Sequence, residues 1–525
     1  MTAGTAGTAG PTRTTGATGT ARATVAAVDL GAESGRVARV GFDGAQLELD
    51  VVHRFTHTPR DVDGVLRWNL ATLEGGIRHG LGTLAAGDTE IASVGVDGWG
   101  VDYGLLDADG NLVDEPTCYR DARQVATYDD ALDTIGARRL YDATGVQVIP
   151  INTVFALASD ARDLPSRLED ASSLLMLPDV FHHLLSGSRV TEYSAVSTSG
   201  CYDMARNAWA TDLLDELGIP THMLPEVVQP GTDVGPLLDD LATGRLSTTR
   251  VVMPPGHDTA SAVVGAPLAH PHGLYISSGT WSLVGVEVPK PVISDDTQAR
   301  NITNEGGYAG TIRLLRNVAG LWLLQACRRV WAAEGRLYTY PELVTLAEQA
   351  AGLDSIVNPD APEFLDGRDA PARIQAYCAA TGTTVPQTPG EIVRCTLDSL
   401  ALSYRAVVDD LTEVTGQAIP SVNIVGGGSN NALLSQLTAD ATGLPVHCGP
   451  VEATALGNAA TQLVALGELS GLADIRRVIA GTTDMTTYAP TPRTDRWDDA
   501  SAHFTRLLAR DRERPDLAGT VMSDS

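Results

Sequence analysis

Apolar runs that end in turn residues recur along the chain and predict buried strands. The first, Val25 to Leu30, carries Asp29 near its end and leads through a turn between Gly31 and Gly35 into a second apolar run, Val37 to Val40. Short apolar runs on either side of a turn are typical of a β-hairpin. A carboxylate at the end of the first strand could hold Mg²⁺ through water. The plainer alternative is that Asp29 only shapes the turn.

Two further glycine-rich turns follow predicted strands in the second half of the chain. A hairpin of the same kind is predicted over 274–287, which suggests a duplicated fold. The strand predicted over 422–425 ends at three consecutive glycines, 426–428, and leads into a helical pattern over 432–441. Such glycines let a backbone come close to a flat ligand, although a plain strand-to-helix turn also uses glycine.

Another carboxylate stands where a predicted strand gives way to a predicted helix. Arg250 to Met253 predicts a short buried strand, Pro254-Pro255-Gly256 ends it, and the small residues from Thr259 to Val264 predict a tightly packed helix start. Asp258 is therefore expected at a helix N-terminus. It can act there as a catalytic base, or it can be an N-cap that accepts a backbone N–H bond.

The segment between the two predicted hairpins offers groups that could face a polyol. Trp99 stands between Gly98 and Gly100, just after a predicted strand that ends in the carboxylate of Asp97. A tryptophan among glycines can lay its face on a sugar ring, and the alternative is a position in the core. The cluster from Arg120 to Arg123 can bond hydroxyl groups, and the alternative is a solvated network of ion pairs.

Composition and charge limit the partners. The 525 residues include 37 basic and 65 acidic side chains, a formal charge of -28, so no global field draws the chain to nucleic acid or to an anionic membrane. Bound phosphate must be held by local backbone N–H groups, a metal ion or single arginines. The six cysteines are scattered without a Cys-x-x-Cys pair, which favours reduced thiols in the cytoplasm. No apolar run approaches the roughly 20 residues that a membrane helix needs.

Several motifs occur in an order that resembles the FGGY-type carbohydrate kinases, and the resemblance covers the chain from Val25 to about Leu466. Three features are shared with the wider fold of sugar kinases, actin and chaperones: Asp29-x-Gly31, Ser278-Gly279-Thr280 and Gly426-Gly427-Gly428. More specific motifs resemble the branch of the family that acts on L-rhamnulose. They are Asp-Leu-Gly-Ala-x-Ser-Gly-Arg (29–36), Trp-Gly-Val-Asp-Tyr (99–103), Tyr-Arg-Asp (119–121), His-Asp-Thr-Ala-Ser-Ala-Val (257–263), Ser-Ser-Gly-Thr-Trp-Ser-Leu (277–283), Asn-Ile-Thr-Asn-Glu-Gly-Gly (301–307), Gly-Leu-Trp-Leu-Leu-Gln (320–325) and Gly-Pro-Val-Glu-Ala-Thr-Ala-Leu-Gly-Asn (449–458).

The resemblance implies an α/β chain with two domains of the actin/hexokinase-like (ribonuclease H-like) fold and an active site in the interdomain cleft. A disordered tail is expected over 1–24, because this segment is nearly all Thr, Ala and Gly. The N-terminal kinase domain, 25–265, would bind the sugar and supply the catalytic base. The C-terminal kinase domain, 266–490, would bind the nucleotide, and a C-terminal extension would cover 491–525. Closure of the two domains would bring base and nucleotide together.

The activity implied by the resemblance is ATP-dependent, Mg²⁺-assisted phosphorylation of the 1-hydroxyl of L-rhamnulose, in L-rhamnose catabolism. Phosphoryl transfer asks mainly for positioning and charge stabilisation, so an ordinary ionised Asp258 suffices as the base. The resemblance assigns sugar contacts to Gly100, His257, Asp258, Thr259 and Asn317. It assigns nucleotide contacts to Ala32, Glu33, Ser34, Gly35, Arg36, Thr280, Gln325 and Gly427. It makes Asp29 the organiser of Mg²⁺. For Asn317 the alternative is the N-cap of a helix predicted over 318–331.

Two departures from the family pattern bear on substrate preference. Position 33 is Glu where the family usually has Ser or Thr, and position 98 is Gly where it usually has Thr. Glu33 is expected to point outward or toward Mg²⁺. Other substrates, namely L-fuculose, D-xylulose or glycerol, stay open, as does an oligomeric state of monomer or dimer.

Two function classes without sugar phosphorylation are weighed against the kinase. A chaperone-like or filament-forming ATPase activates water and needs no polyol site, so the His257-Asp258-Thr259 setting favours a kinase. A sugar-responsive regulator that has lost catalysis is disfavoured by the intact Asp29 and Asp258. The partners expected are a small sugar and ATP, with no nucleic acid and no membrane.

Overall fold

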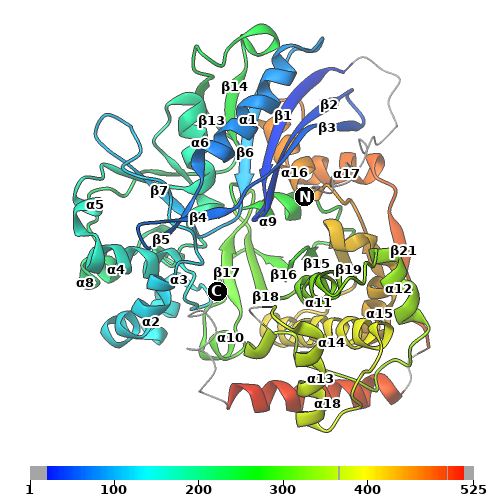
Figure 1. Cartoon of the computed structure of the whole chain (residues 1–525). Coiled ribbons are helices and arrows are strands. Elements are labelled where there is room, and N and C mark those ends of the chain that lie inside the picture. The colour runs from blue at the N-terminus through cyan, green and yellow to red at the C-terminus, as the bar shows by residue number, and fades with distance from the viewer. Residues whose placement is uncertain (1–20, 365–366, 493–494, 514–525) are drawn as a thin grey trace.

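The two largest β-sheets lie in separate halves of the chain, one above the other in Figure 1. The computed structural model describes residues 21–364, 367–492 and 495–513. The first sheet has the strand order β13-β14-β6-β1-β2-β3. Its strands are β1 (Ala23–Leu30), β2 (Ser34–Phe42), β3 (Leu47–Thr56), β6 (Ser93–Gly98), β13 (Thr232–Pro236) and β14 (Arg250–Met253).

The central strand of the first sheet is the apolar run that opens the ordered sequence. Seven of the eight residues of β1 are buried, because β2 pairs with it on one edge and β6 on the other. β2 runs antiparallel and β6 parallel to β1, and the parallel register sets Asp29 opposite Asp97. β1 begins at Ala23 and so includes the last two residues of the predicted tail. Residues 1–20 of that tail lie outside the described residues.

The second sheet repeats the central arrangement of the first. Its order is β17-β18-β16-β15-β19-β20-β21, and β15 pairs antiparallel with β16 and parallel with β19. A hairpin beside a parallel strand therefore occurs in both halves. The strands are β15 (Leu274–Ser278), β16 (Trp281–Val288), β17 (Thr303–Gly306), β18 (Ile312–Ala319), β19 (Val422–Val425), β20 (Val446–Cys448) and β21 (Thr486–Tyr488).

Helices pack against both sheets and bury several apolar cores, and two of these cores join the sheets to helices of the second half. The larger core joins β15, β16 and β18 to the helices that lie low in Figure 1, including α18, the last described helix. A second core joins β1, β2 and β3 to α16 and α17, which follow the second sheet in sequence. The helices of the second half are α10 (Asp295–Ala299), α11 (Trp322–Ala333), α12 (Tyr340–Glu348), α13 (Ala370–Thr381), α14 (Pro389–Thr415), α15 (Ala432–Thr442), α16 (Ala453–Ala465), α17 (Leu472–Thr482) and α18 (Asp495–Arg512).

Smaller elements complete the first half. Its helices are α1 (Leu70–Ala85), α2 (Ala122–Ile135), α3 (Ala137–Thr144), α4 (Thr153–Asp163), α5 (Pro165–Glu169), α6 (Leu177–Ser186), α7 (Tyr193–Val196), α8 (Thr211–Glu216) and α9 (Asp258–Val264). Short strand pairs are β4 (Pro59–Val62) with β5 (Val65–Trp68), β7 (Tyr103–Leu106) with β8 (Ser173–Met176), β9 (Thr191–Glu192) with β12 (Val227–Val228), and β10 (Tyr202–Asp203) with β11 (Ala208–Trp209). Three 3₁₀ turns, 244–246, 362–364 and 427–430, complete the list. Within the described ranges no helix is long and apolar enough to cross a bilayer.

One predicted helix begins later than expected. The run 318–331 was predicted as helix, but Val318 and Ala319 belong to β18 and α11 starts at Trp322. Asn317 is therefore a strand residue and not an N-cap. A short apolar run fits a buried strand as well as a buried helix, and Gly320 separates the two elements here.

Helices α9 and α16 cross between the two sheets at closely packed glycines (Figure 1). A Cβ on Gly457 would lie 1.9 Å from the carbonyl oxygen of Ser261, and one on Gly265 would lie 2.1 Å from that of Ala453. Real Cβ atoms do not approach backbone so closely. The small-residue pattern after Asp258 is therefore a packing requirement of this crossing.

We expect Gly457→Ala to destabilise the protein by about 1–3 kcal/mol or more, because the two backbones must move apart. Thermal or denaturant unfolding measures this. Gly82→Ala is the matched control, since Gly82 lies exposed in α1 with no atom near its absent Cβ. That exchange should be neutral or stabilise by up to about 1 kcal/mol. Equal melting temperatures for Gly457→Ala and Gly82→Ala would contradict close packing of α9 and α16 at this crossing.

Candidate active site

Asp29 ends the first strand and is held by an arginine of the second. Arg36 donates from Nε to the Asp29 carboxylate at 3.0 Å and also approaches it with Nη2. The remaining amino group, Nη1, pairs with Glu452 at 2.6 Å. Burying Asp29 is tolerable because of this pairing. Arg36, expected at the nucleotide, is thus already engaged by two carboxylates.

The central residues of the turn after Asp29 are exposed to solvent. Glu33 and Ser34 are exposed and Ala32 is half-buried, so three of the residues expected at the phosphates are accessible. Gly35 is buried for a different reason, because a Cβ there would lie 2.3 Å from the ring of Phe55. The glycine serves packing, while Glu33 points into solvent as expected.

Asp97 is a second carboxylate at the same sheet edge, and the sequence offered it only as a group that could face a polyol, without a role in the site. It is fully buried, and its Oδ2 accepts a hydrogen bond from Asn458 of α16 at 2.6 Å. Its Oδ1 has no partner among the described residues. Burial, with Asp29 and Asp258 nearby, raises the pKa of Asp97 well above its ordinary value, although Asn458 and Arg36 oppose the rise. A buried oxygen without a donor is poised to accept one from a ligand or a bound ion.

Asp258 is the first residue of α9, and its side chain remains accessible. The N-cap position belongs to His257, so the N-cap alternative for Asp258 is wrong. The Thr259 hydroxyl donates to Asp258 Oδ1 at 3.2 Å, and the side chain of Asp258 is 31% exposed. Burial of the site raises the pKa of Asp258, the neighbouring His257 lowers it, and Asp29 raises it further. An accessible carboxylate of raised basicity can accept a proton from a bound hydroxyl.

The loop before Asp258 is fixed by a buried glutamate that we did not predict. Glu192 accepts the backbone N–H of Gly256 at 2.7 Å, and the hydroxyl of Ser194 accepts that of His257 at 3.2 Å. Burial raises the pKa of Glu192 to about 7, although the bonds from Ser194 oppose the rise. Gly98 also donates its N–H to the carbonyl of Gly256 at 2.9 Å, which ties this loop to β6.

The residues expected at the sugar are only partly accessible. Thr259 and His257 are buried beside Asp258. A Cβ on Gly100 would lie 2.8 Å from Thr198 Oγ1, so Thr198 fills the space that this glycine leaves. Asn317 is half-buried and donates to Gln147 at 3.4 Å, across the two halves of the chain.

Trp99 is a core residue, as its alternative held. It is 7% exposed, its ring lies 4.5 Å from that of Trp68, and both indoles donate to Asp102. In the cluster after Tyr119, the buried Asp121 pairs with the half-buried Arg123 at 2.8 Å, whereas Arg120 is exposed. These contacts account for Trp99, Asp121 and Arg123 without a ligand.

The residues expected at the nucleotide surround the end of β15. The carbonyl of Thr280 accepts the N–H of Trp322, which starts the helix that carries Gln325. The third glycine turn meets the same strand end, because a Cβ on Gly428 would lie 2.0 Å from Ser278 Oγ. Gly427 itself is exposed, with no atom within 4 Å of its absent Cβ. Thr280, Gln325 and Gly427 are thus carried on three elements that meet at one place.

Comparisons with known proteins place this architecture in a family. Residues 25–265 match the N-terminal domain, and residues 274–466 the C-terminal domain, of the FGGY family of carbohydrate kinases. A rhamnulokinase of Bacteroides thetaiotaomicron is 40% identical over 480 residues, which are 91% of this chain and 98% of that protein. A rhamnulokinase of Pectobacterium carotovorum is 42% identical over 493 residues, 92% of this chain and 96% of that protein.

The chain belongs to the FGGY family of carbohydrate kinases.

Solved structures confirm the fold of this FGGY kinase. A xylulose kinase from Lactobacillus acidophilus superposes with a TM-score of 0.78 at 17% identity, covering 94% of this chain and 99% of that chain. A glycerol kinase of Plasmodium falciparum with ADP superposes with a TM-score of 0.74 at 14% identity, covering 94% of this chain and 98% of that chain. The predicted α/β fold of two actin/hexokinase-like domains is confirmed, and so is a carbohydrate kinase as the enzyme class.

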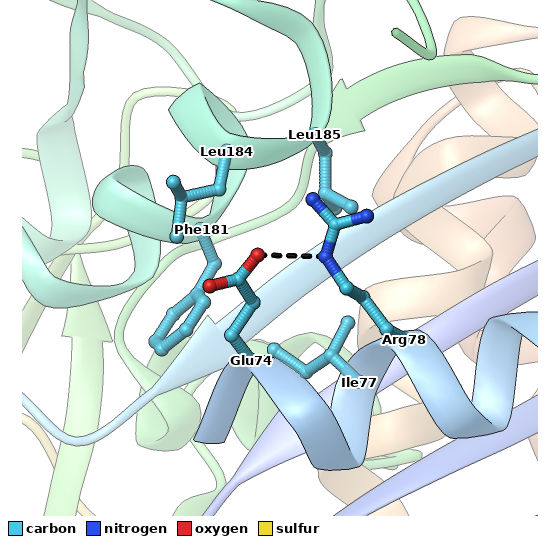
Figure 2. A pocket seen from close by; sticks show the side chains of 6 residues that line it. All are labelled: Glu74, Ile77, Arg78, Phe181, Leu184 and Leu185. Carbon is cyan, nitrogen blue, oxygen red and sulfur yellow. Dashed lines mark hydrogen bonds and ion pairs between the residues drawn. The ribbon is translucent and has the colours of Figure 1, made fainter. Parts of the chain in front are cut away.

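A small hollow on the surface of the FGGY kinase lies away from these residues. Figure 2 shows it between α1 and α6, where Glu74 and Arg78 pair at 2.6 Å over Ile77 and Phe181. Its volume is about 10 Å³, which is at the lower limit for one water molecule. It has no room for a sugar or a nucleotide.

Proposed function

We propose that this FGGY kinase transfers the terminal phosphoryl group of ATP to O1 of L-rhamnulose. The observation that carries the substrate is the similarity to two rhamnulokinases, at 40% and 42% identity over more than nine-tenths of the chain. The more distant solved kinases, at 14–20% identity, support the fold and not the sugar. L-Fuculose, D-xylulose and glycerol are the alternative acceptors to be tested.

The mechanism assigns Asp258 as the base that accepts the proton of the attacking hydroxyl. Asp258 is the first residue of α9, the helix that lies between the two sheets in Figure 1, and its carboxylate is accessible. His257, Thr259, Gly100 and Asn317 are proposed to surround the sugar. Ala32 to Arg36, Thr280, Gln325 and Gly427 are proposed to surround ATP. Because the transition state is loose, positioning by these groups contributes more than the strength of the base.

Magnesium is proposed as the ion that accompanies ATP, and Asp29 and Asp97 are the residues that would hold it. The fit rests on the buried Oδ1 of Asp97, which has no partner among the described residues. No group of three or more His, Cys, Asp or Glu side chains in those residues is placed to bind a metal directly. Mg²⁺ usually keeps several waters and takes few protein carboxylates, so two carboxylates suit it. Bound there, it would neutralise charge on the phosphates.

Localisation and assembly belong to the same proposal. We propose a cytoplasmic enzyme, which the six free and buried cysteines support. Monomer and dimer both remain compatible with it.

An ADP-release assay over a panel of ketoses and polyols tests the function. We expect kcat/KM for L-rhamnulose to exceed that for L-fuculose, D-xylulose and glycerol by about tenfold or more, equivalent to about 1.4 kcal/mol. Phosphorus NMR of the product should show a 1-phosphate. A higher kcat/KM for another acceptor would replace L-rhamnulose as the substrate.

Glu33 carries a negative charge in a loop that is proposed to bind phosphates. Because it is exposed, we expect Glu33→Ser to leave KM for Mg-ATP within a few-fold. Steady-state kinetics at fixed ionic strength measure this, with Glu48→Ser on β3 as a control for loss of one negative charge. A tenfold lower KM, about 1.4 kcal/mol, would show that Glu33 opposes the phosphates.

A further inference from the structure

An arginine and a glutamate of the second sheet reach the histidine beside the proposed base. Arg313 lies on β18 with a fully buried side chain, and Glu305 lies on the neighbouring β17. Arg313 Nη2 lies 3.1 Å from Glu305 Oε2 and 3.1 Å from His257 Nδ1. The other ring nitrogen, Nε2, lies 3.4 Å from Asp258 Oδ1.

The arginine decides which ring nitrogen carries the proton. A guanidinium group has donors and no acceptor, so a hydrogen bond from Arg313 requires a bare Nδ1 on His257. Glu305 Oε2, 3.3 Å from the same nitrogen, could instead accept a proton from it. Glu305 Oε2 has no hydrogen bond of acceptable geometry among the described residues. The contact of Arg313 Nη2 with His257 Nδ1, in contrast, has the geometry of a hydrogen bond. For a neutral imidazole, this geometry favours the proton on Nε2, facing Asp258.

The positions of Arg313 and Glu305 are themselves tightly built. Arg313 Nε donates to the carbonyl of Gly306 at 2.9 Å, and the N–H of Gly306 donates to Ser197 at 2.7 Å. A Cβ on Gly306 would lie 2.5 Å from the ring of Tyr193. Arg313 and His257 together hold the pKa of Glu305 below its ordinary value, against the opposing effect of burial. The Asn-Glu-Gly segment thus anchors the pair to the first half of the chain.

We propose that Arg313 is a positioning residue for phosphoryl transfer, because its bond to Nδ1 directs the Nε2–H of His257 toward the carboxylate of Asp258. This inference rests on the proposed role of Asp258. With the proton on Nε2, the imidazole donates toward Oδ1 and keeps the carboxylate oriented and ionised. With the proton on Nδ1, a lone pair would face the carboxylate and repel it. The contact also crosses from the second sheet to α9, so it requires the two halves to be correctly docked.

The first test reads the tautomer directly. In the full-length protein labelled with ¹⁵N-histidine, two-bond ¹⁵N–¹H correlations distinguish the two tautomers, and His257→Gln assigns the signal. We expect the Nε2–H form in the wild-type protein without any ligand. An Nδ1–H form would overturn the proposal, whatever sugar the enzyme phosphorylates.

The second test uses variants and separates turnover from binding. Arg313→Met should move the proton to Nδ1 and lower kcat by about 10- to 100-fold, with KM for Mg-ATP within threefold. Glu305→Gln should keep the Nε2–H form, since Arg313 still donates to Nδ1. Its kcat should fall by less than that of Arg313→Met. If Glu305→Gln changes the tautomer and Arg313→Met does not, Glu305 decides it and the proposal is wrong.

A control accounts for the loss of a buried charge. Arg167→Met removes an arginine that is equally buried but pairs with Asp160 and Asp114, away from His257. It should lower thermal stability with kcat unchanged below the melting transition. All turnover is measured with the best acceptor of the wild-type enzyme, so a failure of the L-rhamnulose assignment leaves this test intact. Equal kcat in the wild type and in folded Arg313→Met would overturn the proposal.

Discussion

Asp258→Asn should lower phosphorylation of the best acceptor by about 10²- to 10⁴-fold and leave ATP affinity within a few-fold. The amide has nearly the same shape but cannot accept the proton of the attacking hydroxyl. The fold should survive, because Asp258 is not the N-cap of α9 and its side chain is 31% exposed. Stopped assays with the variant at high concentration measure residual turnover, and calorimetry with an ATP analogue measures binding.

A surface exchange of the same kind is the control for Asp258→Asn. Asp240 pairs with Arg78 on the surface with 60% of its side chain exposed, so Asp240→Asn should leave kcat unchanged. Turnover of Asp258→Asn close to that of the wild type would mean that another group accepts the proton. Asp97 and Asp29 would then be the next carboxylates to examine.

The parts of this site that sequence predicts are those with a local signal. Asp29 and Asp258 each stand where an apolar strand meets a turn, and both strands were predicted from hydrophobic pattern alone. The glycine turns were also visible in the sequence, but the contacts that require glycine at these positions were not. Gly35 and Gly428 are dictated by Phe55 and Ser278, which contact them only in the folded chain.

The residues that sequence analysis missed depend on contacts between distant segments. Asp97 was visible as a carboxylate at a strand end, but its partner, Asn458, lies 361 positions away. Arg313 interrupts an apolar strand and would ordinarily be placed in solvent, whereas its side chain is fully buried against Glu305. The parallel register of β1 and β6 could have pointed to Asp97, since it repeats the strand-end carboxylate of Asp29.

The geometry of a strand end does not by itself separate binding from packing. Trp99 shows this, since glycines on both sides suggested an open aromatic face. The ring is instead packed on Trp68, and its N–H is used by Asp102. Burial raises the pKa of Asp102 to about 7, although both indole donors oppose the rise. An aromatic residue with an internal acceptor is thus explained without a sugar.

Asp97→Asn should make the protein more stable and the enzyme less active. The pKa of Asp97 is raised well above its ordinary value, chiefly by burial. A carboxyl group of this kind contributes stability below its unfolded pKa of about 3.9 and loses that contribution as pH rises through the folded pKa. Above the folded pKa the ionised side chain therefore opposes folding, and an amide does not. We expect a melting temperature at least about 1 °C higher at pH 7.5, with the difference shrinking toward pH 4.

The activity of Asp97→Asn should move in the opposite direction, because a carboxylate that costs stability must be retained for its charge. If Asp97 helps hold Mg²⁺, kcat at saturating ATP should fall by at least about tenfold. The rise in melting temperature on adding Mg-ATP should also be smaller than in the wild type, since a ligand that binds less tightly stabilises the folded protein less at the same concentration. Asp398→Asn, another buried carboxylate, is the control, because Asp398 of α14 accepts bonds from the N–H of Leu353 and from Arg394 and lies outside the proposed site. That exchange should lower stability. An Asp97→Asn enzyme with wild-type kcat and an undiminished response to Mg-ATP would remove Asp97 from the proposed metal site.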